Sequence, residues 1–178
     1  MRFCRVVTTI SAVVVAICAM PIGLQAQSKE QISAATELMA VQQMSVTLNT
    51  IANSVIGRQP PDLQSVFRSE PVRAAFLTKL ETMMKQAIVR NLSLQDMKFA
   101  TGFYTGPLGK SLIAKQQSGR AREITPEEHA AFEQFQASPG GNSVGLKMGA
   151  AQNEFRSSSG PMIVGFVADL QRASPPKH

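Results

Sequence analysis

The spacing of apolar residues is the feature that most constrains what this chain can fold into. Between residues 29 and 57, apolar side chains recur at intervals of three and four, as one face of a helix requires: Val41, Met44, Leu48, Ile51 and Val55. No segment alternates β-branched and polar residues for long enough to indicate a strand. The pattern predicts an all-α protein, a helical bundle of about five to seven helices.

Capping residues and prolines predict where further helices begin. Pro71 suits the first turn of a helix that starts near Ser69 and ends at Arg90 and Asn91. Ser93 and Thr125 each stand three residues before an acidic residue, which is the capping-box pattern of a helix start. We expect a loop over residues 157–160 and a last helix from Pro161 to Leu170.

The N-terminal residues predict export. Arg2 and Arg5 precede an uncharged apolar run over residues 6–20, and Ala26 provides a small residue for cleavage. We therefore expect a signal peptide over 1–26 and a periplasmic or secreted protein, with an uncleaved anchor as the alternative. The rest divides into an amphipathic helix and linker (27–69), a helical repeat domain (70–172) and a disordered tail (173–178).

Charge and cysteine content narrow the class of partner. The net charge is +6, but the basic residues are scattered, so a nucleic-acid partner is not expected. A weak contact with anionic membrane stays open. Both cysteines lie in the expected signal peptide, which excludes a disulfide or a thiolate metal site from the rest of the chain. We expect no cofactor and no metal.

A shift of 32 residues aligns residues 92–115 with 124–147 without a gap. Five of the 24 aligned positions are identical, and they include the proline and glycine at which each unit breaks. The identical pairs are Phe103 with Phe135, Pro107 with Pro139, Gly109 with Gly141, Ser111 with Ser143 and Lys115 with Lys147. The alignment predicts two tandem helix–break–helix units over 92–117 and 124–149.

The first unit resembles a bacterial family. Residues 94–97 (Leu-Gln-Asp-Met) followed by 102–111 (Gly-Phe-Tyr-Thr-Gly-Pro-Leu-Gly-Lys-Ser) are similar to the signature of the exported "domain of unknown function 2059". Gly106 stands where that family usually has serine, and the second unit replaces the tyrosine with Gln136 and the lysine with Asn142. The resemblance implies a mostly helical envelope protein and no known activity.

The motif residues have a structural and a functional interpretation. We expect Phe103 and Phe135 in the core, Pro107 and Pro139 as helix stops, and the glycines Gly109 and Gly141 as points of close backbone approach. Tyr104 and Gln136, which occupy matching positions, are the candidate binding residues. We expect neither residue to be catalytic, since no catalytic constellation is evident.

Three sharper hypotheses are weighed against simpler ones. Ser143 lies in a Gly-x-Ser-x-Gly sequence, but a nucleophile elbow also needs a preceding strand. The Ser-x-x-x-Lys spacing at Ser111 and Ser143 permits a serine–lysine dyad, although solvated lysines are the simpler expectation. His129 and Glu133 could hold two metal ligands on one helix face, but nothing completes the site.

The leading function is therefore a non-enzymatic envelope module that binds another protein or an envelope component through a helical groove. Methionines at 39, 44, 83 and 84 provide either core filling or the adaptable surface of such a groove. The alternatives are an envelope hydrolase, or a hydrolase accessory protein, that uses Ser143 or His129, and a protein that binds the membrane surface. The sequence leaves the oligomeric state open.

Overall fold

A computed structural model describes residues 28–173, and within them the chain is all α-helical, as predicted. The predicted signal peptide and nearly all of the predicted tail lie outside these residues. The helices are α1 Lys29–Val41, α2 Met44–Gly57, α3 Pro61–Arg68, α4 Glu70–Asn91, α5 Leu94–Thr105, α6 Pro107–Gln117, α7 Pro126–Ala137 and α8 Pro139–Ala173, with a short 3-10 turn at Ala121–Glu123. None of the described helices is both long and apolar enough to cross a membrane.

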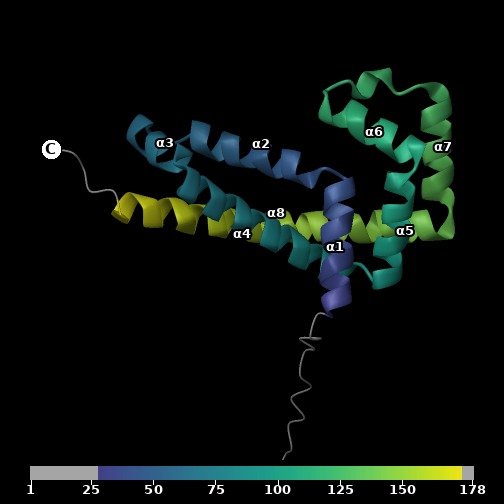
Figure 1. Cartoon of the computed structure of the whole chain (residues 1–178), viewed down its shortest axis with the longest axis horizontal. Helices are drawn as coiled ribbons and strands as arrows, with labels where there is room; N and C mark the ends of the chain where they lie inside the picture. The colour runs from purple at the N-terminus through teal and green to yellow at the C-terminus, as the bar shows by residue number, and fades with distance from the viewer. Residues whose placement is uncertain (1–27, 174–178) are drawn as a thin grey trace, which may run out of the picture.

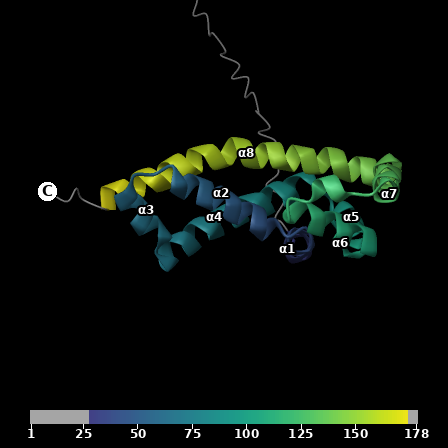
Figure 2. The same cartoon turned by 90° about the horizontal axis from the view of Figure 1, so that it is seen from above.

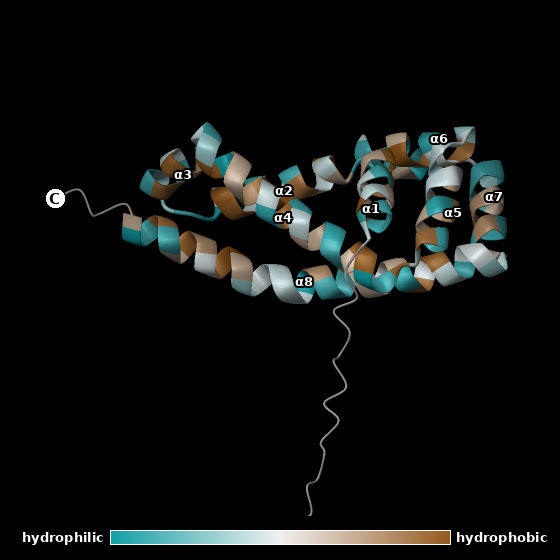
Figure 3. Cartoon of the chain, turned by 60° about the horizontal axis from the view of Figure 1, so that its bottom comes forward, coloured by the Kyte–Doolittle hydropathy of each residue, from teal (hydrophilic) through white to brown (hydrophobic). Residues whose placement is uncertain are grey.

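The long helix α8 organises the bundle. It runs the length of the molecule, and the other helices lie along one side of it (Figures 1 and 2). Its C-terminal part packs along α4, while α5 and α7 contact its N-terminal part. Apolar residues recur along this long, curved helix (Figure 3), and several of them, such as Phe155, Ile163 and Phe166, pack in or against the core.

The main core lies between α1, α2, α3, α4, α5 and α8. Three phenylalanines from three different helices meet there: Phe67 and Phe76 have ring centroids 5.1 Å apart, and Phe166 lies 5.5 and 5.0 Å from them. Phe67 and Phe76 are completely buried. Burial of such side chains supplies most of the stability of a domain without disulfides.

The predicted helix over residues 29–57 is two helices, which corrects our expectation. The chain turns at Gln42 and Gln43, and Gln43 has a φ of 50° in the left-handed region. The apolar stripe still faces inward, because Leu48 is buried and the other stripe residues pack against the core. The turn lets α1 pack on α5 while α2 packs on α4. Nothing in the local sequence signals the turn, since glutamine is not a usual left-handed residue.

The expected loop at residues 157–160 is also helical, so α8 continues through Pro161. Ser157 and Ser158 donate their hydroxyls to the Glu154 carbonyl oxygen at 2.9 and 2.6 Å, which satisfies them within the helix. Apolar residues on both sides of Pro161 pack against the core, and this tertiary packing outweighs the hydrogen bond that a proline removes.

Candidate functional site

The two predicted units each begin with a capping box. The Ser93 hydroxyl accepts a hydrogen bond from the backbone N–H of Asp96 at 3.1 Å, and the Asp96 carboxylate accepts one from the backbone N–H of Ser93 at 2.9 Å. Thr125 and Glu128 repeat the arrangement at the start of α7, at 3.3 and 2.9 Å. Each box therefore fixes an acidic side chain at a helix start, as the sequence predicted.

The carboxylate of the second unit is bound by the first unit. Glu128 accepts hydrogen bonds from Ser111 Oγ at 2.6 Å and from Lys115 Nζ on α6. We call these three residues the Glu128 cluster. The bonds from Lys115, Ser111 and the Thr125 backbone lower the pKa of Glu128 to about 2.

The carboxylate of the first unit is bound, in turn, by the second. Lys147 Nζ on α8 lies 2.7 Å from Asp96 Oδ2, and Ser143 Oγ lies 3.4 Å from Oδ1. We call these three residues the Asp96 cluster. Burial raises the pKa of Asp96, but the bonds from Lys147 and Ser93 outweigh it and lower the pKa to about 2. The contacts are therefore reciprocal: the serine and lysine of each unit bind the acidic residue of the other unit, and the 32-residue shift aligns the residues of one cluster with those of the other.

Matching aromatic residues also meet where the units join. The rings of Phe103 and Phe135 stack with their centroids 3.8 Å apart, and Phe99, Tyr104 and Phe132 surround them. These two rings are only half-buried and form a cluster apart from the main core, so their expected place inside the core is wrong in part.

The prolines and glycines at the two breaks act together. Pro107 and Pro139 follow the end of one helix and occupy the first turn of the next. A Cβ added to Gly141 would lie 1.9 Å from the Phe135 carbonyl oxygen, and one added to Gly109 would lie 2.4 Å from that of Phe103. Both glycines therefore permit the close backbone approach that we expected of them.

This geometry gives the Ser-x-x-x-Lys pairs a structural role. In both clusters the serine hydroxyl and the lysine ammonium point to the same carboxylate. A serine–lysine dyad instead needs the serine hydroxyl to donate to a neutral lysine amine. The expectation of solvated lysines is wrong for Lys115, whose side chain is only 20% exposed. Ser143 follows helix α7 and lies within α8, so it lacks the strand that a nucleophile elbow needs.

The histidine hypothesis finds no third ligand. His129 Nδ1 and Glu133 Oε1 are 3.5 Å apart, and both side chains are 65% exposed. Among the described residues, no three histidine, cysteine, aspartate or glutamate side chains are grouped closely enough to hold a metal ion.

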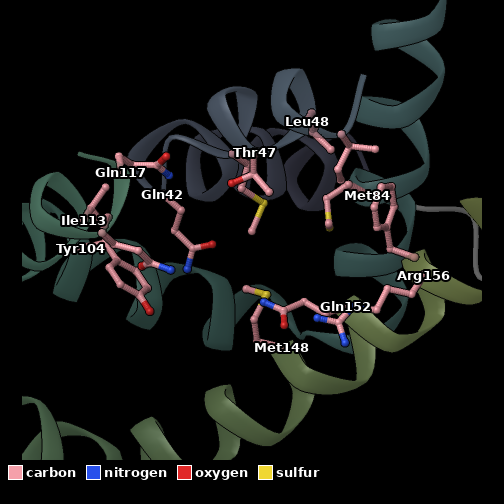
Figure 4. Close-up of a pocket in the computed structure, with 14 residues that line it drawn as sticks. Gln42, Thr47, Leu48, Met84, Tyr104, Ile113, Gln117, Met148, Gln152 and Arg156 are labelled. Carbon is pink, nitrogen blue, oxygen red and sulfur yellow. The ribbon is translucent and has the colours of Figure 1, made fainter. Parts of the chain in front are cut away.

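The described residues form a groove of about 440 Å³ between α2, α6 and α8. This volume is within the range of about 300–1,000 Å³ that is usual for ligand sites. Tyr104, Ile113 and Gln117 lie at one end of the groove and Arg156 lies at the other, with Met148 between them (Figure 4). The lining residues are Gln42, Met44, Thr47, Leu48, Ile51, Met84, Tyr104, Ile113, Gln116, Gln117, Met148, Gln152, Phe155 and Arg156.

The groove combines an apolar middle with polar ends. Arg156 is the only charged residue that lines it, and the guanidinium makes no ion pair within the described part of the chain. At the opposite end lie Tyr104 and Gln42, and burial raises the pKa of the Tyr104 phenol. The arrangement suits a ligand with one anionic group, an apolar part and hydrogen-bonding groups.

The two candidate binding residues do not share this site. Tyr104 lines the groove, whereas Gln136 is exposed on α7 and is not among the lining residues. Met44 and Met84 line the groove. Met39 and Met84 are nevertheless buried in the core, and Met44 and Met83 pack against it, as the core-filling interpretation predicted. Sequence reasoning missed Gln42 and Arg156, and no local signal marks them, since they lie far apart in the chain.

Comparison with known proteins identifies one family. Residues 78–123 match the model of DUF2059, described as an uncharacterized protein family conserved in bacteria. The predicted resemblance is therefore confirmed over this segment, which covers most of α4, all of α5 and α6, and the short turn after them. No curated protein and no solved structure matches the chain.

Proposed function

We propose that this protein is a non-enzymatic binding module of the bacterial envelope, which holds a partner in the groove between α2, α6 and α8. The observation that carries the proposal is Arg156, an exposed cation at the mouth of a methionine-lined groove that contains no acidic residue. A cation that lacks an internal partner is free to pair with a ligand. Methionine side chains adapt to varied apolar surfaces.

The rest of the proposal depends on the sequence. The basic N-terminus, the apolar run and Ala26 favour export, and the family match favours a bacterial protein. The Ser-x-x-x-Lys pairs, which a serine–lysine hydrolase would use, each bind a carboxylate of the other unit. Ser143, one of the two residues of the hydrolase alternative, belongs to one of these pairs. We therefore favour binding over hydrolysis.

Two threonines of α2 allow a matched test. Thr47 lines the groove, while Thr50, one helical turn later, does not, and both are exposed. We would replace each threonine separately with a photo-crosslinking phenylalanine analogue in the full-length protein, irradiate intact bacteria that express it, and identify the adducts by mass spectrometry. Fractionation of the same cells would test the envelope location.

The proposal predicts a discrete adduct from position 47 and none of that mass from position 50. The charge reversal Arg156→Glu should abolish the adduct, whereas Arg122→Glu, at an exposed arginine outside the groove, should not. Adducts that are equal at both positions, or absent from both, would overturn the proposal.

A further inference from the structure

The single charge in the groove restricts what can bind there. Arg156 is exposed, so its guanidinium can rotate to meet a ligand, and its planar fork matches a carboxylate with two parallel hydrogen bonds. No acidic side chain among the lining residues competes for it. The net charge is +6 for the whole chain and +4 without Arg2 and Arg5 of the predicted signal peptide, and it also favours the approach of an anion. The ligand is therefore expected to carry one negative charge at this end.

Apolar side chains line the middle of the groove, between its polar ends. Met44, Met84 and Met148 line it together with Leu48 and Ile51. Thioether side chains are flexible and polarizable, so they can pack against apolar groups of different shapes. This part of the groove favours an apolar ligand segment without fixing its identity.

The glutamines that line the groove favour a peptide over an alkyl chain as its ligand. Gln42, Gln116, Gln117 and Gln152 line the groove and present side-chain amides to it. An alkyl chain would cover these amides without replacing their bonds to water, which is costly. A peptide backbone offers each amide both a donor and an acceptor.

We infer that the groove binds the C-terminal end of an extended apolar peptide, with its free α-carboxylate on Arg156 and its backbone amides on the glutamines. A chain end is favoured over an internal acidic residue because the cavity of about 440 Å³ holds only a few residues. A chain end needs an opening at only one end of the groove, whereas an internal segment needs an opening at both ends. Capture of a terminal carboxylate is a known mode of peptide recognition. The inference depends on the proposed function, since it names the ligand of the same groove.

The protein carries its own reporter for a binding assay. Tyr104 lines the groove, and the chain has one tyrosine and no tryptophan. Peptides without aromatic residues can therefore be titrated while the emission of Tyr104 is followed. The probes are N-acetylated pentapeptides of alanine, leucine, methionine and valine, as free acids and as C-terminal amides. Oleate provides a separate test for an acyl chain.

We expect the free acids to bind and the amides to bind about tenfold more weakly or worse, since a charge-assisted hydrogen bond is lost. In Arg156→Gln the two forms should bind equally, whereas Arg122→Gln should keep the difference. Because Arg156 is exposed, we expect this variant to fold, and circular dichroism checks that it does.

Equal binding of acids and amides to the native protein would overturn the inference, as would Arg156-dependent binding of oleate in place of peptide. A third internal control is a peptide with glutamate in its middle and an amidated end. Tighter binding of that peptide than of the free acids would also overturn the choice of a chain end. If no peptide binds but Thr47 still crosslinks to a partner, the inference fails while the proposed function stands.

Discussion

The two ends of the molecule are held together by different forces. The core end, formed by α2, α3, α4 and the C-terminal part of α8, surrounds fully buried side chains such as Phe67 and Phe76. The unit end, formed by α5, α6, α7 and the N-terminal part of α8, shares buried residues such as Met97 and Ala100 with that core. Its two units, however, are joined by half-buried rings and two ion-pair clusters, and α7 has no buried residue. The core end should therefore respond to changes of volume and the unit end to changes of charge.

The largest expected effect is at the core end. Phe76→Ala removes a completely buried ring, and the free energy of unfolding should fall by about 3–5 kcal/mol. Phe99→Ala removes a ring of the unit end that is 43% exposed, and the loss should be about 1 kcal/mol. Urea unfolding of both variants measures the difference. Equal losses would mean that the two ends do not differ as described.

The glycines of α8 provide the next largest contrast. Gly141→Ala places a Cβ against the Phe135 carbonyl oxygen, so the backbone at the break has to shift, at a cost of about 1–3 kcal/mol. Gly145→Ala, one turn later, meets nothing within 4 Å. That variant should gain about 0.5–1 kcal/mol, because alanine is the better helix former. Thermal unfolding of the pair gives both signs, and destabilisation by Gly145→Ala would contradict the close approach as the cause.

Local signals explain how much of the fold could be predicted. The starts of α4, α5 and α7 were found because a cap or a proline acts on its own helix turn. The break at Gln43 and the continuous helix through Pro161 were missed because tertiary packing decides both. A left-handed glutamine and a mid-helix proline are locally unfavourable, and only contacts with distant helices stabilise them.

In the candidate site, too, local sequence does not reveal which residues of different helices come together. The spacing of Ser111 and Lys115 correctly indicated that they share a helix face, but the carboxylate between them comes from the other unit. The groove draws on α2, α4, α5, α6 and α8, so its residues cannot be found from sequence spacing. That residues 92–117 and 124–149 are two copies of one repeat stays a prediction, which the matching clusters support.

As the pH falls, we expect the unit end to lose stability before the core end does. The pKa values of Asp96 and Glu128 are about 2 in the folded protein, below their ordinary values of 3.8 and 4.5. Their contribution is therefore complete above about pH 4.5 and is lost as the pH falls toward 2. Solvent partly screens these charges, so Asp96 should contribute only about 1 kcal/mol.

Hydrogen exchange at pH 7 and pH 3 measures this effect helix by helix. Protection in α5, α6 and α7 should fall at pH 3, while protection in α4 is kept. In the double variant Asp96→Asn with Glu128→Gln, the unit end should already be weaker at pH 7 and should change little with pH. A variant whose acid response matches that of the native protein would show that other groups control it.

The smallest expected effect is the difference in stability contributed by the Asp96 cluster and by an ordinary surface ion pair. Lys147 pairs with Asp96, whose side chain is 12% exposed, so Lys147→Ala should cost about 1 kcal/mol. Lys98 pairs with Glu30 at 2.9 Å, but both side chains are 63% exposed, and Lys98→Ala should cost about 0–0.5 kcal/mol. Urea unfolding at low and high salt tests both. Because salt screens exposed pairs most, the Lys98 effect should vanish at high salt while the Lys147 effect persists. If both effects vanish, the Asp96 cluster is no more than a surface contact, and the Glu128 cluster and the stacked rings hold the two units together.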